Sequence, residues 1–221
     1  MASRASILCY YDIVSPYSYI GVKLLNRYRL QWKDVDVVYR PVFLGGIMAG
    51  AKNQPPAMVP AKGTYMMGDL KKISAATGIP FRFPSQFPLL TILTMRLLVV
   101  IQKQEPAKYE QCIDKDEYWC NDKNIAENEV IVNALAPIVG SVDKMKKYLE
   151  MTSQKEIKQG LIDNTDQALA AGAFGAPTWV VKQAGSDKEH MFFGSDRFEL
   201  MATLLNQPYP GLTFGRPSAK L

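Results

Sequence analysis

The apolar positions along the chain change their spacing twice and so divide it into three stretches. In the first stretch, β-branched and aromatic residues fill positions 6–14, as in a strand, and Pro16 then opens a segment with apolar residues at helical spacing. A second strand pattern occupies residues 35–43. A strand, a helix and a strand joined by a connection of this length predict two parallel strands.

The middle stretch, from about residue 45 to residue 172, has helical spacing with clear stop signals. Gly78 and Pro106 mark helix ends, and Ser153 and Glu156 stand at capping-box spacing. The predicted helices cover residues 64–77, 89–104, 107–120, 127–135, 142–151 and a last segment that runs to about residue 171.

The last stretch returns to strands at residues 178–182 and 189–193, separated by a turn at Gly185-Ser186-Asp187 that predicts a hairpin. A final helix is predicted over residues 196–205, where Asp196 and Glu199 again have capping-box spacing. The whole order predicts one α/β domain interrupted by an all-helical insertion.

Charge and cysteine usage narrow the function classes. The formal net charge is +5, but the lysines are scattered in pairs, as on solvated helix faces, so we expect no nucleic-acid partner. Cys9, Cys112 and Cys120 form neither a metal pattern nor a C-x-x-C pattern, which favours a reducing compartment and no metal. The most apolar segment, residues 89–101, is interrupted by polar residues and too short to cross a bilayer, so membrane insertion is not expected.

Ser15 and Pro16 stand where the first strand passes into the first helix. Helix capping explains both residues fully, because serine satisfies a free amide and proline tolerates the first helical position. The same place also suits a thiolate. Lowering a thiol pKa by ~2 units requires about 2.7 kcal/mol, and a hydrogen bond to a charged group contributes about 1.5–3 kcal/mol.

Two further loops carry candidate chemistry. A small-residue loop meets Pro177 directly before a strand, where the Ala176–Pro177 peptide bond could be cis; the alternative is a trans proline that opens an edge strand. Ser195 and Asp196 precede the last helix, where free amides could bind a ligand carboxylate or be capped without any ligand.

Together these segments resemble the kappa-class glutathione transferases. The resemblance runs in order from about residue 7 to residue 205. It is carried by Tyr11-Asp12, Ser15-Pro16-Tyr17-Ser18, Arg40-Pro41, Gly46-Ile47-Met48, Asn53 with Pro55-Pro56, Lys62-Gly63, Tyr65-Met66, the run from Gly172 to Pro177 and the run from Phe193 to Arg197.

The resemblance implies a thioredoxin-like fold split by a helical insertion, as in DsbA. The thioredoxin-like domain would comprise residues 1–63 and 173–221, and the insertion residues 64–172. It further implies a homodimer that uses glutathione as co-substrate and conjugates it to small electrophiles, with peroxide reduction as a second activity.

The same resemblance assigns site residues. Ser15 would be the catalytic residue and donate a hydrogen bond to the glutathione sulfur, with Pro16 and Tyr17 beside it. The Ala176 backbone, before a cis Pro177, would pair with the cysteinyl backbone. The two ends of glutathione would be held by Ser195 and Asp196 at the γ-glutamyl group and by Asn53 and Lys62 at the glycyl group.

Other functions stay open to different degrees. Thiol-disulfide exchange is excluded here because both Ser15 and Ser18 are serines. A glutathione-dependent isomerase of the 2-hydroxychromene-2-carboxylate type shares the architecture and the Ser-Pro-Tyr frame, and a non-catalytic thioredoxin-like binding module is the alternative from another class. The ending Ala219-Lys220-Leu221 is close to a peroxisomal address, with the mitochondrial matrix as the alternative compartment.

Overall fold

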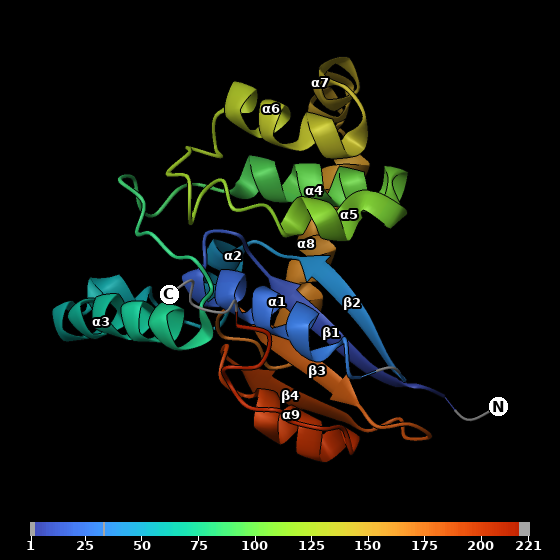
Figure 1. The fold of residues 1–221 in the computed structure, drawn as a ribbon. Helices are drawn as coiled ribbons and strands as arrows, with labels where there is room; N and C mark the ends of the chain where they lie inside the picture. The colour runs from blue at the N-terminus through green and yellow to red at the C-terminus, as the bar shows by residue number, and fades with distance from the viewer. Residues whose placement is uncertain (1–2, 33, 217–221) are drawn as a thin grey trace.

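Four strands form one mixed sheet in the order β2-β1-β3-β4 (Figure 1). The computed structural model describes residues 3–32 and 34–216 and bounds the strands as β1 (Ala5–Tyr11), β2 (Val35–Pro41), β3 (Thr178–Lys182) and β4 (Glu189–Phe193). Strands β1 and β2 are parallel, and β3 is antiparallel to both β1 and β4. The predicted parallel pair and the C-terminal hairpin are therefore confirmed.

The helices fall into two groups. Those that belong to the sheet layer are α1 (Pro16–Tyr28), α2 (Leu44–Gly50) and α9 (Phe198–Leu205). The long middle stretch supplies a 3-10 turn η1 (Pro56–Met58), α3 (Pro60–Thr77), α4 (Ile92–Gln104), α5 (Pro106–Ile113), α6 (Asn128–Val139), α7 (Val142–Met151) and α8 (Lys155–Ala170). This is the DsbA-like arrangement of a thioredoxin fold with helices inserted between β2 and β3.

Both faces of the sheet are covered by helices. On one face, α1 and α9 pack on the apolar side chains of β1 and β3; a Cβ at Gly21 of α1 would come within 2.9 Å of the Trp179 ring. On the other face, Ile47 of α2 and Ala168 of α8 pack against Tyr10 and Val180. The insertion helices α4 to α7 stack at one end of the sheet, and α3 projects to the side (Figure 1).

A single apolar core runs from the sheet into the insertion. The same cluster contains Ile7 and Trp179 of the sheet together with Leu98 of α4 and Leu135 of α6. At the junction, the hydroxyl groups of Tyr11 and Tyr109 are hydrogen-bonded at 2.8 Å. The predicted division at residues 63 and 172 stays a prediction, and its first boundary falls inside α3, which begins at Pro60.

Several predicted element ends were wrong. Strand β1 ends at Tyr11 instead of residue 14, because residues 13 and 14 form a turn before Ser15. Helix α5 ends at Ile113 instead of residue 120, since residues 117–121 turn away from the helix. Helix α6 continues to Val139, past the predicted end at residue 135.

Neither predicted capping box forms. Ser153 donates its hydroxyl back to the Glu150 carbonyl at 2.8 Å, and Gln154 is the residue before α8. Helix α9 begins at Phe198 after Arg197, and the Asp196 carboxylate pairs with the Arg197 guanidinium at 3.2 Å instead of capping the helix.

Within the described ranges, no helix combines the length and the apolar character needed to cross a membrane. The C-terminal Ala219-Lys220-Leu221 lies outside those residues, so the peroxisomal address stays a prediction.

Candidate functional site

Ser15 caps helix α1 at the end of a turn formed by residues 12–15, called the Ser15 turn below. Its Oγ accepts a hydrogen bond from the Ser18 amide at 3.1 Å and donates one to the Ala176 carbonyl at 2.8 Å. Pro16 occupies the first helical turn, where its missing N–H leaves no bond unmade. The capping interpretation is therefore confirmed, and the hydroxyl proton is directed at Ala176.

The loop that ends at Pro177, directly before β3, lies beside Ser15 and contains its partner Ala176. The Ala176–Pro177 peptide bond is cis, and the Pro177 carbonyl accepts a hydrogen bond from the Gly194 amide at 3.0 Å. Gly194 has φ +98°, a conformation that side chains other than glycine rarely adopt, and its carbonyl accepts the Trp179 indole N–H at 2.7 Å. These bonds place the buried Ser195 beside the proline loop.

Asn53, which follows helix α2, contacts the same loop. Its side-chain amide donates to the Phe174 carbonyl at 2.7 Å, and its own Oδ1 accepts the Gln54 amide at 2.8 Å. Asn53 therefore lies near the loop that carries Ala176, although both of its hydrogen bonds go to the backbone.

Tyr17 connects the first turn of α1 to α3. Its hydroxyl donates to Asp69 at 2.9 Å. Burial raises the pKa of Tyr17 well above its ordinary value, and the charges of Asp69 and Asp196 add to the shift. The Asp196 carboxylate is thus close enough to Tyr17 to contribute to the raised pKa of its hydroxyl.

A surface pocket of about 370 Å³ lies between the Ser15 end of α1 and helix α3. Its walls are mostly apolar, and Lys62 supplies the positive charge. Among the residues that the structure describes, Lys62 has no carboxylate partner within ion-pair distance. The lining residues are Tyr17, Pro56, Ala61, Lys62, Tyr65 and Met66.

Asp12 is the buried carboxylate of the site region. It is 0% exposed, and it accepts hydrogen bonds from the amides of Val14 and Leu44 and from the Thr91 hydroxyl. Burial raises the pKa of Asp12 to about 6, and the three hydrogen bonds keep it from rising further. At neutral pH the chain therefore holds a negative charge three residues before Ser15.

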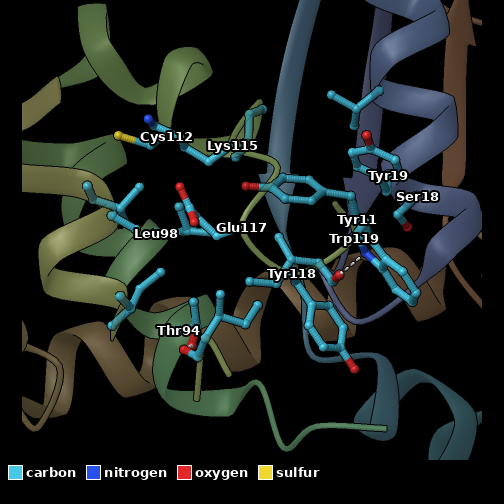
Figure 2. Close-up of a pocket in the computed structure, with 17 residues that line it drawn as sticks. Tyr11, Ser18, Tyr19, Thr94, Leu98, Cys112, Lys115, Glu117, Tyr118 and Trp119 are labelled. Atoms are coloured by element: carbon cyan, nitrogen blue, oxygen red, sulfur yellow. Dashed lines mark hydrogen bonds between the residues drawn. The ribbon is translucent and has the colours of Figure 1, made fainter. Parts of the chain in front are cut away.

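A second, inner cavity of about 50 Å³ lies behind the first turn of α1, between the sheet domain and the insertion (Figure 2). Apolar and aromatic side chains form most of its wall, among them Tyr11, Leu98 and Trp119. Ser18 lines it, is 1% exposed, and its Oγ has no hydrogen-bond partner in the described structure. Cys112 also lines it, and burial raises the pKa of that thiol to about 11, so it is a poor nucleophile at neutral pH.

The predicted site residues converge around the Ser15 end of α1. Ser15 contacts Ala176 directly, Asn53 contacts the same loop, Ser195 adjoins Pro177, and Tyr17 links to the pocket that contains Lys62 and to the charge of Asp196. Three polar interactions were not predicted from the sequence. They are the bond from Tyr17 to Asp69, the bond from Thr91 to Asp12, and the binding of backbone amides by the Asp12 carboxylate. Asp12 stood in a recognised motif, but nothing in the sequence connects it to Thr91, which lies 79 positions away.

The chain is similar to known proteins over most of its length. The family model described as the DSBA-like thioredoxin domain matches residues 6–206. The glutathione S-transferase kappa 1 of Caenorhabditis elegans is 35% identical over 211 residues, covering 91% of each chain. The protein of the same name from Homo sapiens is 33% identical over 209 residues, again covering 91% of each chain.

A solved structure of a 2-hydroxychromene-2-carboxylate isomerase superposes with a TM-score of 0.74 over 91% of this chain and 94% of that one. The two sequences are 16% identical, so this similarity supports the fold alone.

Proposed function

Because the chain belongs to the kappa-class glutathione transferases, a family built on the DsbA-like thioredoxin domain, we propose that it transfers glutathione to small electrophiles and that Ser15 stabilises the glutathione thiolate. The observation that carries the proposal is the Ser15 hydroxyl, which caps α1 and directs its proton at the Ala176 carbonyl 2.8 Å away.

Binding exchanges one hydrogen bond for two. The Ser15 proton turns from the Ala176 carbonyl to the ligand sulfur, and the freed carbonyl accepts the cysteinyl amide of glutathione. A hydrogen bond between neutral groups contributes about 0.5–1.5 kcal/mol, and one to a charged group about 1.5–3 kcal/mol. The exchange therefore favours the thiolate over the neutral thiol, and the positive end of α1 adds to this preference.

The ends of the tripeptide are assigned from the family resemblance, and the residues present suit them chemically. The γ-glutamyl end binds at Ser195 and Asp196, where a buried hydroxyl and a carboxylate suit an ammonium group and a carboxylate side by side. The glycyl carboxylate binds toward Lys62 and Asn53. Ser15, Pro16, Tyr17 and Ala176 hold the cysteinyl part between them.

The role of Ser15 is tested by titrating the thiolate absorbance of bound glutathione in wild type and in Ser15→Ala. Loss of one hydrogen bond to the charged sulfur should raise the thiolate pKa by about 1–2 units, while glutathione affinity changes only several-fold. Ser18→Ala is the matched control, because the Ser18 hydroxyl has no hydrogen-bond partner among the described residues and lines the inner cavity.

An unchanged titration in Ser15→Ala would remove the serine from the proposed mechanism. Glutathione-dependent isomerisation without stoichiometric conjugate would favour the isomerase function, and failure to bind millimolar glutathione in calorimetry would favour a non-catalytic module. Peroxide reduction by the same thiolate is also part of the proposal and is tested by measuring turnover of an organic hydroperoxide. A homodimer is proposed as well and is tested by analytical sedimentation.

A further inference from the structure

The helical insertion contacts the Ser15 turn through two hydrogen bonds, one buried and one partly buried. Thr91, the residue before α4, donates its hydroxyl to Asp12 Oδ1 at 2.8 Å. Trp119 donates its indole N–H to the Ile13 carbonyl at 2.8 Å, the dashed line in Figure 2. Both donors come from residues far along the chain, so tertiary structure alone brings them to the turn.

Asp12 joins three segments at one carboxylate. Oδ1 accepts the Val14 amide of the same turn at 3.1 Å as well as the Thr91 hydroxyl, and Oδ2 accepts the Leu44 amide at the start of α2 at 2.9 Å. The Asp12 carbonyl also accepts the Ser15 amide at 3.0 Å. One side chain thus fixes the turn internally and ties it to α2 and α4.

We propose that Thr91 is a positioning residue for Ser15, through which the insertion fixes the turn that aims the catalytic hydroxyl. The proposal rests on the thiolate-stabilising role of Ser15 given above. Thr91 holds the Asp12 carboxylate, the carboxylate holds Val14, and Val14 precedes Ser15.

Because these groups are buried, loss of the hydrogen bond between Thr91 and Asp12 should be costly. Asp12 is 0% and Thr91 1% exposed, so a lost Thr91 donor is not replaced by bulk water. A buried carboxylate deprived of one donor shifts toward its remaining donors. Because a hydrogen bond to sulfur depends on direction, a small displacement of Ser15 lowers the fraction of thiolate and the rate of its attack.

The experiment compares Thr91→Val with Thr94→Val. Thr94 lies one turn further along α4, is equally buried, and donates its hydroxyl to the Ile125 carbonyl at 2.8 Å, away from the site. Each variant loses one buried hydroxyl at nearly constant volume. Thr91→Val should lose more stability, because its hydroxyl is bonded to a carboxylate and that of Thr94 to a neutral carbonyl, so the readouts are compared at a temperature at which both variants are fully folded. The readouts are kcat and KM with an aromatic halide as electrophile, the thiolate titration of bound glutathione, and hydrogen exchange at the Val14 and Ser15 amides.

We expect Thr91→Val to lower kcat by about tenfold, with KM for glutathione within about threefold, and to raise the pH of thiolate formation. Exchange at Val14 and Ser15 should speed up as well. Thr94→Val should leave all three readouts at wild-type values, and Thr91→Ser, which keeps the hydroxyl, should restore them.

Equal kinetics, titration and exchange in the two valine variants would overturn the positioning role, even while Ser15→Ala still shows the thiolate shift. If Ser15→Ala shows no shift, the proposed function fails separately. Amide exchange then still decides whether Thr91 holds the turn: faster exchange in Thr91→Val alone supports it, and wild-type exchange overturns it.

Discussion

Asp12 makes the stability of the protein depend on pH in an unusual direction. The pKa of a free aspartate is about 3.9, and burial raises the pKa of Asp12 to about 6 in the folded chain. Between these values the folded state holds the proton more tightly than the unfolded state, so this residue's contribution is fully present below about pH 3.9. It is lost as the pH rises to about 6.

The measurement is urea unfolding of wild type and Asp12→Asn from pH 4 to pH 7. Relative to the variant, wild type should lose about 2 kcal/mol of unfolding free energy across this range. Whatever constant cost the amide brings at Leu44, the pH-dependent part remains. A difference between the two proteins that stays flat with pH would show that the Asp12 pKa is not raised.

At the scale of single residues, the sequence predicted what local rules control. Ser15 and Pro16 fit the preferences of a helix start, and their position at the end of a strand made the cap predictable. The bond from Thr91 to Asp12 has no local signal, because it depends on where the insertion docks. For the same reason the link between Tyr17 and Asp69 was not predicted.

The same contrast holds for whole elements. The hairpin β3–β4 was predicted at its observed residues, since two strand-like segments flank the turn after Ala184. The two capping boxes failed because each serine or aspartate had a nearer partner: the Glu150 carbonyl for Ser153 and the Arg197 guanidinium for Asp196. A spacing rule cannot see such competition.

Helix α1 must approach β3 closely to place Ser15 beside Ala176, and Gly21 permits that approach. A Cβ there would lie 2.9 Å from the Trp179 ring and 3.3 Å from Pro177. Gly21→Ala should therefore destabilise the protein by about 1–3 kcal/mol, although alanine favours helices.

Gly68→Ala on α3 is the control for this substitution, because a Cβ there meets nothing within 4 Å. It should stabilise the protein by up to about 1 kcal/mol. Denaturant midpoints of the two variants check the pair; stabilisation by both would mean that α1 has room to move from Trp179.

On the scale of the whole molecule, the apolar core crosses the junction between sheet and insertion. The fold class was predictable because a strand-helix-strand start and a hairpin finish flank a long helical block. The core that the insertion shares with the sheet was not predictable. Helical spacing shows which face of a helix is buried, but it does not show which element packs against that face.

A shared core predicts cooperative unfolding. Amides of β3 and of α4 should exchange with similar protection under native conditions, each at close to the global unfolding free energy. Hydrogen exchange at rising sub-denaturing urea separates the two regions. If α4 opens at markedly lower free energy than β3, the insertion unfolds independently.

If Ser15 holds the glutathione thiolate as proposed, the direction of its hydroxyl also bears on how a product leaves. In the proposed mechanism, its single proton would return to the Ala176 carbonyl, its partner in the structure, whenever the ligand offers a weaker acceptor. A conjugate is a thioether, whose sulfur carries no charge and accepts hydrogen bonds poorly. Under this proposal, conjugation would weaken the hydrogen bond from Ser15 to the sulfur, and the hydroxyl would bond to the Ala176 carbonyl again as the product departs. The hydrogen bond between Ser15 and Ala176, which glutathione would displace on binding, would thus compete with binding of the conjugate and favour its release.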